Sequence, residues 1–197
     1  MIQDAFFIEN YLLVSCILVL IMSIKIMQIK QLSILSVFII IFFFFPGQKL
    51  FSKELEKFND WTAFAEGEGK NLACMAVSKP KKAEGDYTKR GDVFAIVTHL
   101  PGQKKWNEFS VVAGYNYKTN SNPDIFIDQK KFQLFTSGSR AWSFSPSDDE
   151  KIINFLKKSI KMKVVGTSSR GTITTDSFSL MGFSKAYKKI NEACNKN

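Results

Sequence analysis

Apolar and polar positions alternate over most of the chain beyond residue 57, and this period-two pattern predicts a series of short, half-buried β-strands. The clearest case is EFSVVAGYNY, which places Phe109, Val111 and Ala113 on one side. DVFAIVTH (92–99) is apolar on both faces and therefore predicts a strand in the centre of a sheet. Eight or so strands are expected in all, the others lying at 58–66, 71–78, 120–128, 131–135, 139–145, 161–169 and 171–180.

The last two of these strands are expected to form a hairpin that turns at residues 169–171. Its apolar parity changes between Ile173 and Phe178, which predicts a bulge near Thr175. The polar lead at 52–57 and the charged stretch SKPKKAEGD (78–86) are expected to lie outside the sheets.

Two helices are expected to interrupt and close this series. Ser147 and Glu150 form a capping box, and an apolar stripe follows it on one helical face. The members of the stripe are Ile152, Ile153, Leu156 and Ile160. Capping explains the acidic cluster at 148–150 more simply than a metal site does. Gly182 breaks the last strand, and Ser184 is expected to cap the second helix. The pattern predicts a mainly β fold, an immunoglobulin-like antiparallel β-sandwich with one inserted helix and a C-terminal helix.

Two apolar runs precede the strands, at residues 11–24 and 32–45. Each is shorter than the roughly 20 residues that span a bilayer as a helix. The second run follows Lys25 and Lys30 and is followed by Pro46, an order typical of a secretory signal peptide. We therefore expect residues 1–52 to be a signal peptide or membrane segment, and residues 53–197 to form one domain.

Several alternatives exist for the N-terminal segment. Translation that starts at Met22 or Met27 would give a well-proportioned signal peptide, with cleavage after Ser52 conceivable. A membrane-anchoring helical hairpin would instead place the Lys25/Lys30 turn in the cytoplasm. LVSC resembles a lipoprotein cleavage box at Cys16, but apolar residues continue beyond it and no basic region precedes it.

The charge distribution bears on the choice of partner. Residues 1–45 carry two acidic and two basic side chains, so the whole net charge of +9 belongs to the remainder of the chain. Such a domain is attracted to polyanions, although its lysines are dispersed and also serve solubility. We expect an envelope component as partner, either a protein or an anionic glycan or lipid, and no nucleic acid.

Trp106 is the best candidate for an exposed contact residue. It follows Lys104 and Lys105 in LPGQKKWN, which is expected to connect two strands as a hairpin turn. Aromatic side chains with basic neighbours are typical of contact surfaces. Trp61 and Trp142 lie within strands and are expected to be core residues.

The sequence offers few groups for catalysis. His99 is the only histidine, and it lies at a strand end, where a structural role is expected. Phosphate-binding and nucleophile-elbow motifs are absent, and no Cys/His spacing suits zinc. We predict no catalytic, metal or cofactor-binding residues. GTSSRGT (166–172) could bind an anion through its backbone, although a hairpin turn explains it better.

Cys74 and Cys194 are the cysteines outside the apolar segment. In an exported domain such a pair favours one structural disulfide. Two buried free thiols are the alternative.

Several stretches carry a resemblance to a known family: FNDWTAF (58–64), CMAVSKP (74–80), RGDVFAIVTH (90–99), SVVAGY (110–115), IDQKKFQLFT (127–136) and the run from 141 to 186 that contains GTSSRGT and DSFSL. Over residues 58–194 the chain resembles the invasion associated locus B family of bacterial exported proteins. The resemblance implies an immunoglobulin-like β-sandwich in the periplasm or envelope, and it supplies no catalytic residues. It also implies Cys74–Cys194 as the bridge, because the chain lacks the further cysteines of some relatives.

These features together predict an exported, non-enzymatic binding module in the periplasm or at the cell surface. One alternative is a periplasmic domain anchored in the inner membrane that contributes to envelope integrity. A periplasmic hydrolase that uses His99 is the enzymatic alternative.

Overall fold

The computed structural model describes residues 52–196, which form twelve strands, two α-helices and two 3-10 turns. The N-terminal segment lies outside the described residues. The structure therefore does not test the expectations made for it, namely the signal peptide, the start at Met22 or Met27, the hairpin anchor and lipidation at Cys16. Within 52–196, no helix is long and apolar enough to cross a bilayer.

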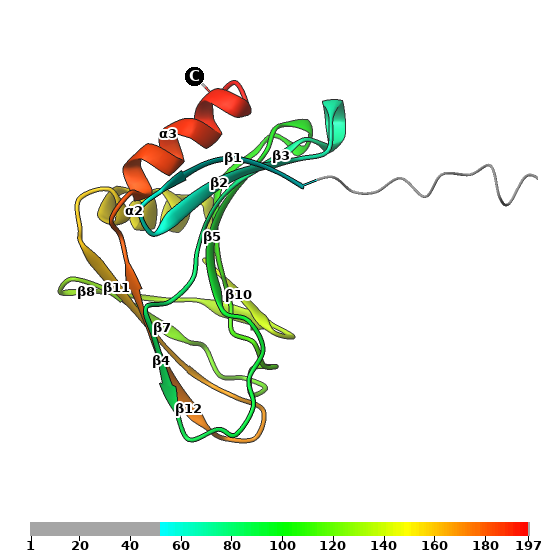
Figure 1. Ribbon diagram of the computed structural model, residues 1–197. Coiled ribbons are helices and arrows are strands. Elements are labelled where there is room, and N and C mark those ends of the chain that lie inside the picture. Colours follow the sequence, from blue (N-terminus) through cyan, green and yellow to red (C-terminus); the bar gives the residue numbers. More distant parts are fainter. Residues whose placement is uncertain (1–51, 197) are drawn as a thin grey trace, which may run out of the picture. The chain divides into compact units, whose positions relative to one another are not determined.

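The strands form two antiparallel sheets (Figure 1). The seven-stranded sheet has the order β1 (Ser52–Phe58), β2 (Trp61–Glu66), β3 (Ala73–Ser78), β5 (Phe94–Leu100), β6 (Lys105–Val112), β10 (Arg140–Trp142) and β9 (Phe135–Ser137). The five-stranded sheet has the order β4 (Lys82–Gly85), β12 (Ile173–Ser179), β11 (Lys161–Thr167), β7 (Asp124–Ile127) and β8 (Lys130–Gln133). Helices α2 (Pro146–Leu156) and α3 (Phe183–Ala193), with the short turns η1 (Gly69–Asn71) and η2 (Pro101–Gln103), complete the fold. The predicted mainly β sandwich with two helices is confirmed.

The core lies between the sheets and beneath α3. Its largest fully buried side chains include Trp61, Phe109, Phe178 and Phe183. Trp61 and Phe183 pack edge to face at 4.8 Å between ring centroids, which joins β2 to α3. The central position predicted for DVFAIVTH is confirmed, because β5 pairs with β3 and β6.

A disulfide joins Cys74 on β3 to Cys194 at the end of α3. Both residues are buried. The bridge therefore fastens the C-terminal helix to the sheet that it covers, and the alternative of two free thiols is wrong.

The helix boundaries differ from the sequence prediction. The N-cap of α2 is Ser145 and not Ser147, because Pro146 suits the first helical position and the Ser145 hydroxyl accepts the Asp148 backbone N–H at 3.2 Å. Three residues of the predicted apolar stripe, Ile152, Ile153 and Leu156, lie in α2 and are buried as expected. The fourth, Ile160, lies beyond the helix and is 73% exposed. Gly182, with φ 93°, caps α3, and Ser184 lies inside that helix.

Three strands were not predicted from the sequence, namely β1, β4 and β9. Each lies at the edge of a sheet. Edge strands commonly carry charged residues on both faces, which discourages pairing with other chains. The lead at 52–57 and the stretch 78–86 therefore showed no apolar alternation, although each contains a strand.

The bulge predicted near Thr175 is absent. The ladder between β11 and β12 runs without a shift from Lys161↔Ser179 to Thr167↔Ile173. The inward face of β12 carries the polar residues Thr174 and Asp176, both 2% exposed, whereas Ile173 is 65% exposed. The change of apolar parity thus reflects a buried polar site and not a change of backbone.

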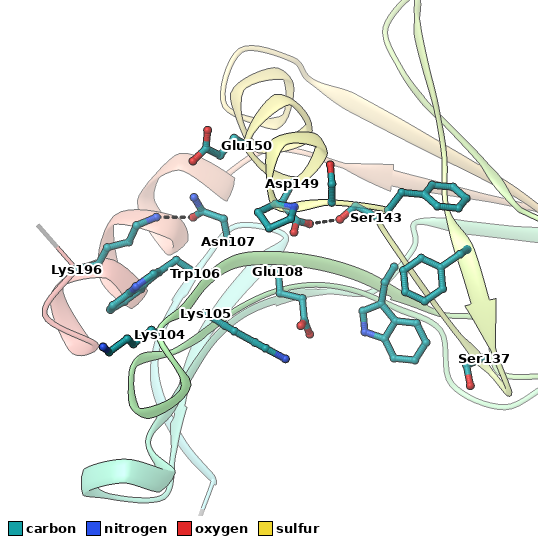
Figure 2. A pocket seen from close by; sticks show the side chains of 15 residues that line it. Lys104, Lys105, Trp106, Asn107, Glu108, Ser137, Ser143, Asp149, Glu150 and Lys196 are labelled. Carbon is teal, nitrogen blue, oxygen red and sulfur yellow. Dashed lines mark hydrogen bonds between the residues drawn. The ribbon is translucent and has the colours of Figure 1, made fainter.

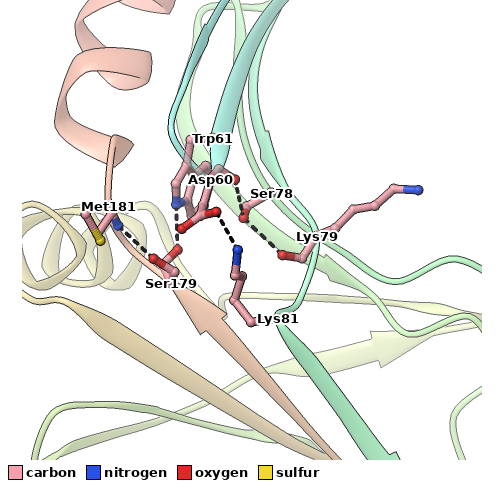
Figure 3. Close-up of polar contacts among 7 residues, drawn as sticks. All are labelled: Asp60, Trp61, Ser78, Lys79, Lys81, Ser179 and Met181. Atoms are coloured by element: carbon pink, nitrogen blue, oxygen red, sulfur yellow. Dashed lines mark hydrogen bonds and ion pairs between the residues drawn. The ribbon is translucent and has the colours of Figure 1, made fainter.

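Polar contacts tie the two sheets together where β2 begins and β12 ends (Figure 3). The Trp61 indole N–H donates to the Ser179 carbonyl at 3.0 Å, and the Ser78 hydroxyl donates to the Asp60 carbonyl at 2.7 Å. Lys81 pairs with the Asp60 carboxylate at 2.9 Å. Hydrogen bonds from Lys81 and Ser179 lower the pKa of Asp60, so this carboxylate stays ionised.

Candidate interaction surface

Among residues 52–196, no strand lies beside the first half of β6 on the β10 side. Within the described residues, β10 pairs with β6 only at residues 110–112, and α2 packs beside the preceding residues. Asp149 of α2 takes the place of a strand, because its carboxylate accepts the Phe109 backbone N–H at 2.8 Å and also the Ser143 hydroxyl. Burial raises the pKa of Asp149, while the bonds from Ser143 and Phe109 act in the opposite direction. This carboxylate fixes α2 and the β10–α2 loop against β6.

A groove with a volume of about 770 Å³ lies between β6, the β9–β10 hairpin and the start of α2. Figure 2 shows Trp106 and Glu108 on the strand side, with Asp149 and Ser143 on the helix side. A volume of this order falls within the range of ligand sites, roughly 300–1,000 Å³.

One end of the groove carries three clustered aromatic side chains. Phe135 stacks on Trp142, with 5.6 Å between centroids and 22° between planes, and Phe144 lies 5.6 Å from Phe135. Phe144 is 55% exposed and Phe135 is 39% exposed. The expectation that Trp142 is a core residue is wrong, because it is half-buried beside these phenylalanines, whereas Trp61 is fully buried as expected.

The three predicted contact residues, Lys104, Lys105 and Trp106, all line this groove. The expected hairpin connection is confirmed, because β5 and β6 pair from Leu100↔Lys105 onward; η2 and Lys104, which is left-handed with φ 55°, make the turn, and β6 begins at Lys105. Trp106 is half-buried, with its ring 5.4 Å from His99. Both lysines are exposed, and neither takes part in an ion pair among residues 52–196.

The aromatic cluster continues an apolar row across the outer face of the seven-stranded sheet. The outer face is the face of this sheet that is turned away from the helices and the second sheet (Figure 1). The cross-strand partners in the row are Thr62, Val77, Ile96, Ser110, Trp142 and Phe135, in that order. Phe64, Met75, Phe94 and Val112 flank this row. An outward sheet face normally carries polar side chains, and an apolar one is typical of an interaction site.

Ile96 and Ser110 occupy the middle of the row and are only 8% and 0% exposed. The Ser110 hydroxyl has no hydrogen-bond partner within the described chain. The neighbouring side chains of the row therefore exclude water from the centre of the outer face, which no element of residues 52–196 covers.

His99 lies elsewhere, beneath α3, and is fully buried. Its Nδ1 atom accepts the Asn107 backbone N–H at 3.1 Å, so the neutral ring carries its proton on Nε2, which donates to the Asn191 side chain at 2.7 Å. Burial is the main cause that lowers the pKa of His99 to about 4. Both ring nitrogens are thus bonded to structural partners.

The sequence did not indicate Phe135, Phe144 or Asp149 as site residues. Asp149 was read as a capping residue, and only the structure shows that it points into the sandwich, 7% exposed. Phe144 offered a weak signal, because it stands just before Pro146, where a strand has to end. In the part of the chain that the structure describes, no group of three or more His, Cys, Asp or Glu side chains is placed to hold a metal ion.

Comparison with known proteins gives one match. The model of the invasion associated locus B protein family matches residues 61–191, from the first residue of β2 to within α3. No curated protein and no solved structure matches the chain significantly. The matched range includes all strands except β1, and it includes every residue that lines the groove except Lys196. The chain belongs to the invasion associated locus B family.

Proposed function

We propose that the protein is a non-enzymatic binding module of the cell envelope, which holds a protein partner on the outer face of its seven-stranded sheet and in the adjoining groove. Membership of the family supports association with the envelope. Export to the periplasm or cell surface belongs to the same proposal, supported by the apolar N-terminal runs and by the Cys74–Cys194 disulfide.

The apolar row on the outer face is the observation that carries this proposal. Interface cores are enriched in aromatic residues and methionine, and the outer face presents Phe64, Met75, Phe94, Trp142 and Phe135. Phe135 is exposed and the others are half-buried, and phenylalanine and methionine side chains lack the hydrogen-bonding groups that a sugar or a lipid headgroup requires. A protein surface with apolar side chains therefore suits this face better than a glycan does.

The groove adds charge to one border of this surface. Lys104, Lys105 and Lys196 carry positive charge at one end, the aromatic cluster occupies the other, and the carboxylates of Glu108 and Glu150 line the groove as well. A partner segment that combines an apolar side chain with an acidic one would match both ends. Such charges contribute to orientation and association rate more than to affinity.

Site-specific cross-linking in native cells tests the proposal. A photoreactive phenylalanine analogue replaces Phe144, and in a matched control it replaces Met181, which is 57% exposed and lies away from the groove. We expect a discrete cross-linked protein product from position 144 and none from position 181. Equal products from both positions, or no product from position 144, would contradict the proposal.

A further inference from the structure

A second cavity lies at the end of the sandwich away from the helices, and we name it the loop cavity. Three segments that are distant in sequence enclose about 590 Å³: residues 86–91, 114–116 and 168–174. The Gly91 N–H donates to the Gly114 carbonyl at 2.9 Å, and the Ser169 N–H donates to the Asn116 carbonyl at 2.7 Å. These bonds hold the walls in place without a ligand.

A buried arginine forms part of the wall of the loop cavity. The side chain of Arg90 is 5% exposed and forms a bidentate pair with Asp176, with both N–O distances 2.7 Å. Its Nε donates to the Ala113 carbonyl at 2.7 Å. These bonds use three of the five guanidinium N–H groups, which leaves two for other acceptors.

The charge of the remaining wall is positive. The charge of Asp176 balances that of Arg90, so the other ionised groups decide the sign of the net charge. These groups are the two cations Lys89 and Arg170 and one carboxylate, Asp86. Lys89 and Arg170 are exposed, and neither belongs to an ion pair among the described residues. Arg170 belongs to the GTSSRGT stretch, so the structure places this turn and the 86–91 loop around one space.

The wall also carries groups that suit a sugar. Hydroxyls line it from Thr88, Ser168, Ser169, Thr172 and Thr174, together with the Asn116 amide. Tyr87 and Tyr115 contribute aromatic rings near Arg90, whose guanidinium carbon lies 5.5 and 4.8 Å from their centroids. The cavity is far larger than one phosphate or carboxylate group needs, so a ligand that fills it combines an anion with a polar ring.

We propose that the loop cavity is a second binding site, which takes a saccharide bearing a phosphate or carboxylate group. Lys89 and Arg170 bind the anionic group, and the hydroxyl and amide side chains bind the sugar. This site is independent of the outer face and of the protein partner proposed for it.

Calorimetric titration of the full chain tests the site with glucose 6-phosphate and glucuronate as probes. The test variant is Lys89→Ala/Arg170→Ala, and the matched control is Lys158→Ala/Lys185→Ala, which removes the same charge from exposed positions that do not line the cavity. We expect saturable binding of either probe, at least tenfold weaker in the test variant and within twofold of wild type in the control.

Inorganic phosphate and glucose serve as probes of the two parts of the ligand, and both are expected to bind more weakly than glucose 6-phosphate. Absence of saturable binding by both anionic sugars would overturn the proposal. Equal loss of affinity in the two variants would also overturn it, as would equal affinity for glucose 6-phosphate and either single probe.

Discussion

At the scale of single residues, His99 is a neutral group in a site that does not admit its charged form. Its pKa is lowered from 6.5 to about 4, mainly by burial. The unfolded chain takes up the proton first as the pH falls. The stability that His99 contributes is therefore fully present above pH 6.5 and is lost between pH 6.5 and about 4.

Replacement of His99 by glutamine removes this titration. The shift corresponds to a decrease of about 3 kcal/mol in the free energy of unfolding of the wild type between pH 7 and pH 4. The glutamine variant does not show this decrease. We expect the stability difference between wild type and His99→Gln to shrink by about that amount over this range. Urea unfolding at a series of pH values measures it, and a difference that stays constant with pH would contradict the assignment of a buried neutral imidazole.

The Arg90–Asp176 pair is the second residue-scale feature with a measurable consequence. Removal of one partner from a buried ion pair costs about 3–5 kcal/mol, because the other charge is left uncompensated. We therefore expect Asp176→Asn and Arg90→Met each to be strongly destabilised. The Arg90→Met/Asp176→Leu double variant is expected to lose much less than the sum, as measured by denaturant unfolding. Additive losses would show that the two groups do not interact.

At the scale of elements, the disulfide holds α3 on the sheet. Cys74 and Cys194 are 120 positions apart. Closure of so long a loop stabilises a fold by about 4–5 kcal/mol in the chain-entropy model. We expect Cys74→Ala/Cys194→Ala to lose stability of this order. A reductant is expected to lower the unfolding midpoint of the wild type and to leave that of the double variant unchanged, and an unaffected wild type would contradict this role.

The elements also show how far the sequence could predict the fold. A strand with one buried face, such as β11, alternates clearly, so its existence was predictable from local pattern. The edge strand β1 was not, because most of its side chains are exposed and its charged residues resemble those of a loop. The regular path of β12 was hidden because Asp176 faces inward to a partner, Arg90, that lies 86 positions away.

Prediction of the groove also failed in part because residues far apart in the sequence come together in it. Lys104, Lys105 and Trp106 are consecutive in the chain, so the sequence could group them as contact residues. Phe135, Trp142 and Phe144 join them only through the pairing of β9, β10 and β6, which no local pattern specifies.

At the scale of the whole molecule, the two faces of the seven-stranded sheet have different surroundings. One face of the seven-stranded sheet closes the core, while the other carries the apolar row from Thr62 to Phe135. The strand β5 was predicted to be central because both of its faces are apolar, and that prediction is correct. The sequence could not show that, among the elements of residues 52–196, none covers one of these faces, and this face is the basis of the proposed function.

The most direct test of that function is the apparent mass of the protein extracted under mild conditions from native envelopes. Phe135→Glu introduces a charge at a 39% exposed position of the apolar row, and Ile173→Glu is the control at a 65% exposed apolar position on the other sheet. We predict that wild type and Ile173→Glu migrate in a complex larger than the 22.4 kDa chain, and that Phe135→Glu migrates alone with an unfolding temperature close to that of the wild type. Identical migration of all three proteins would contradict a partner on the outer face.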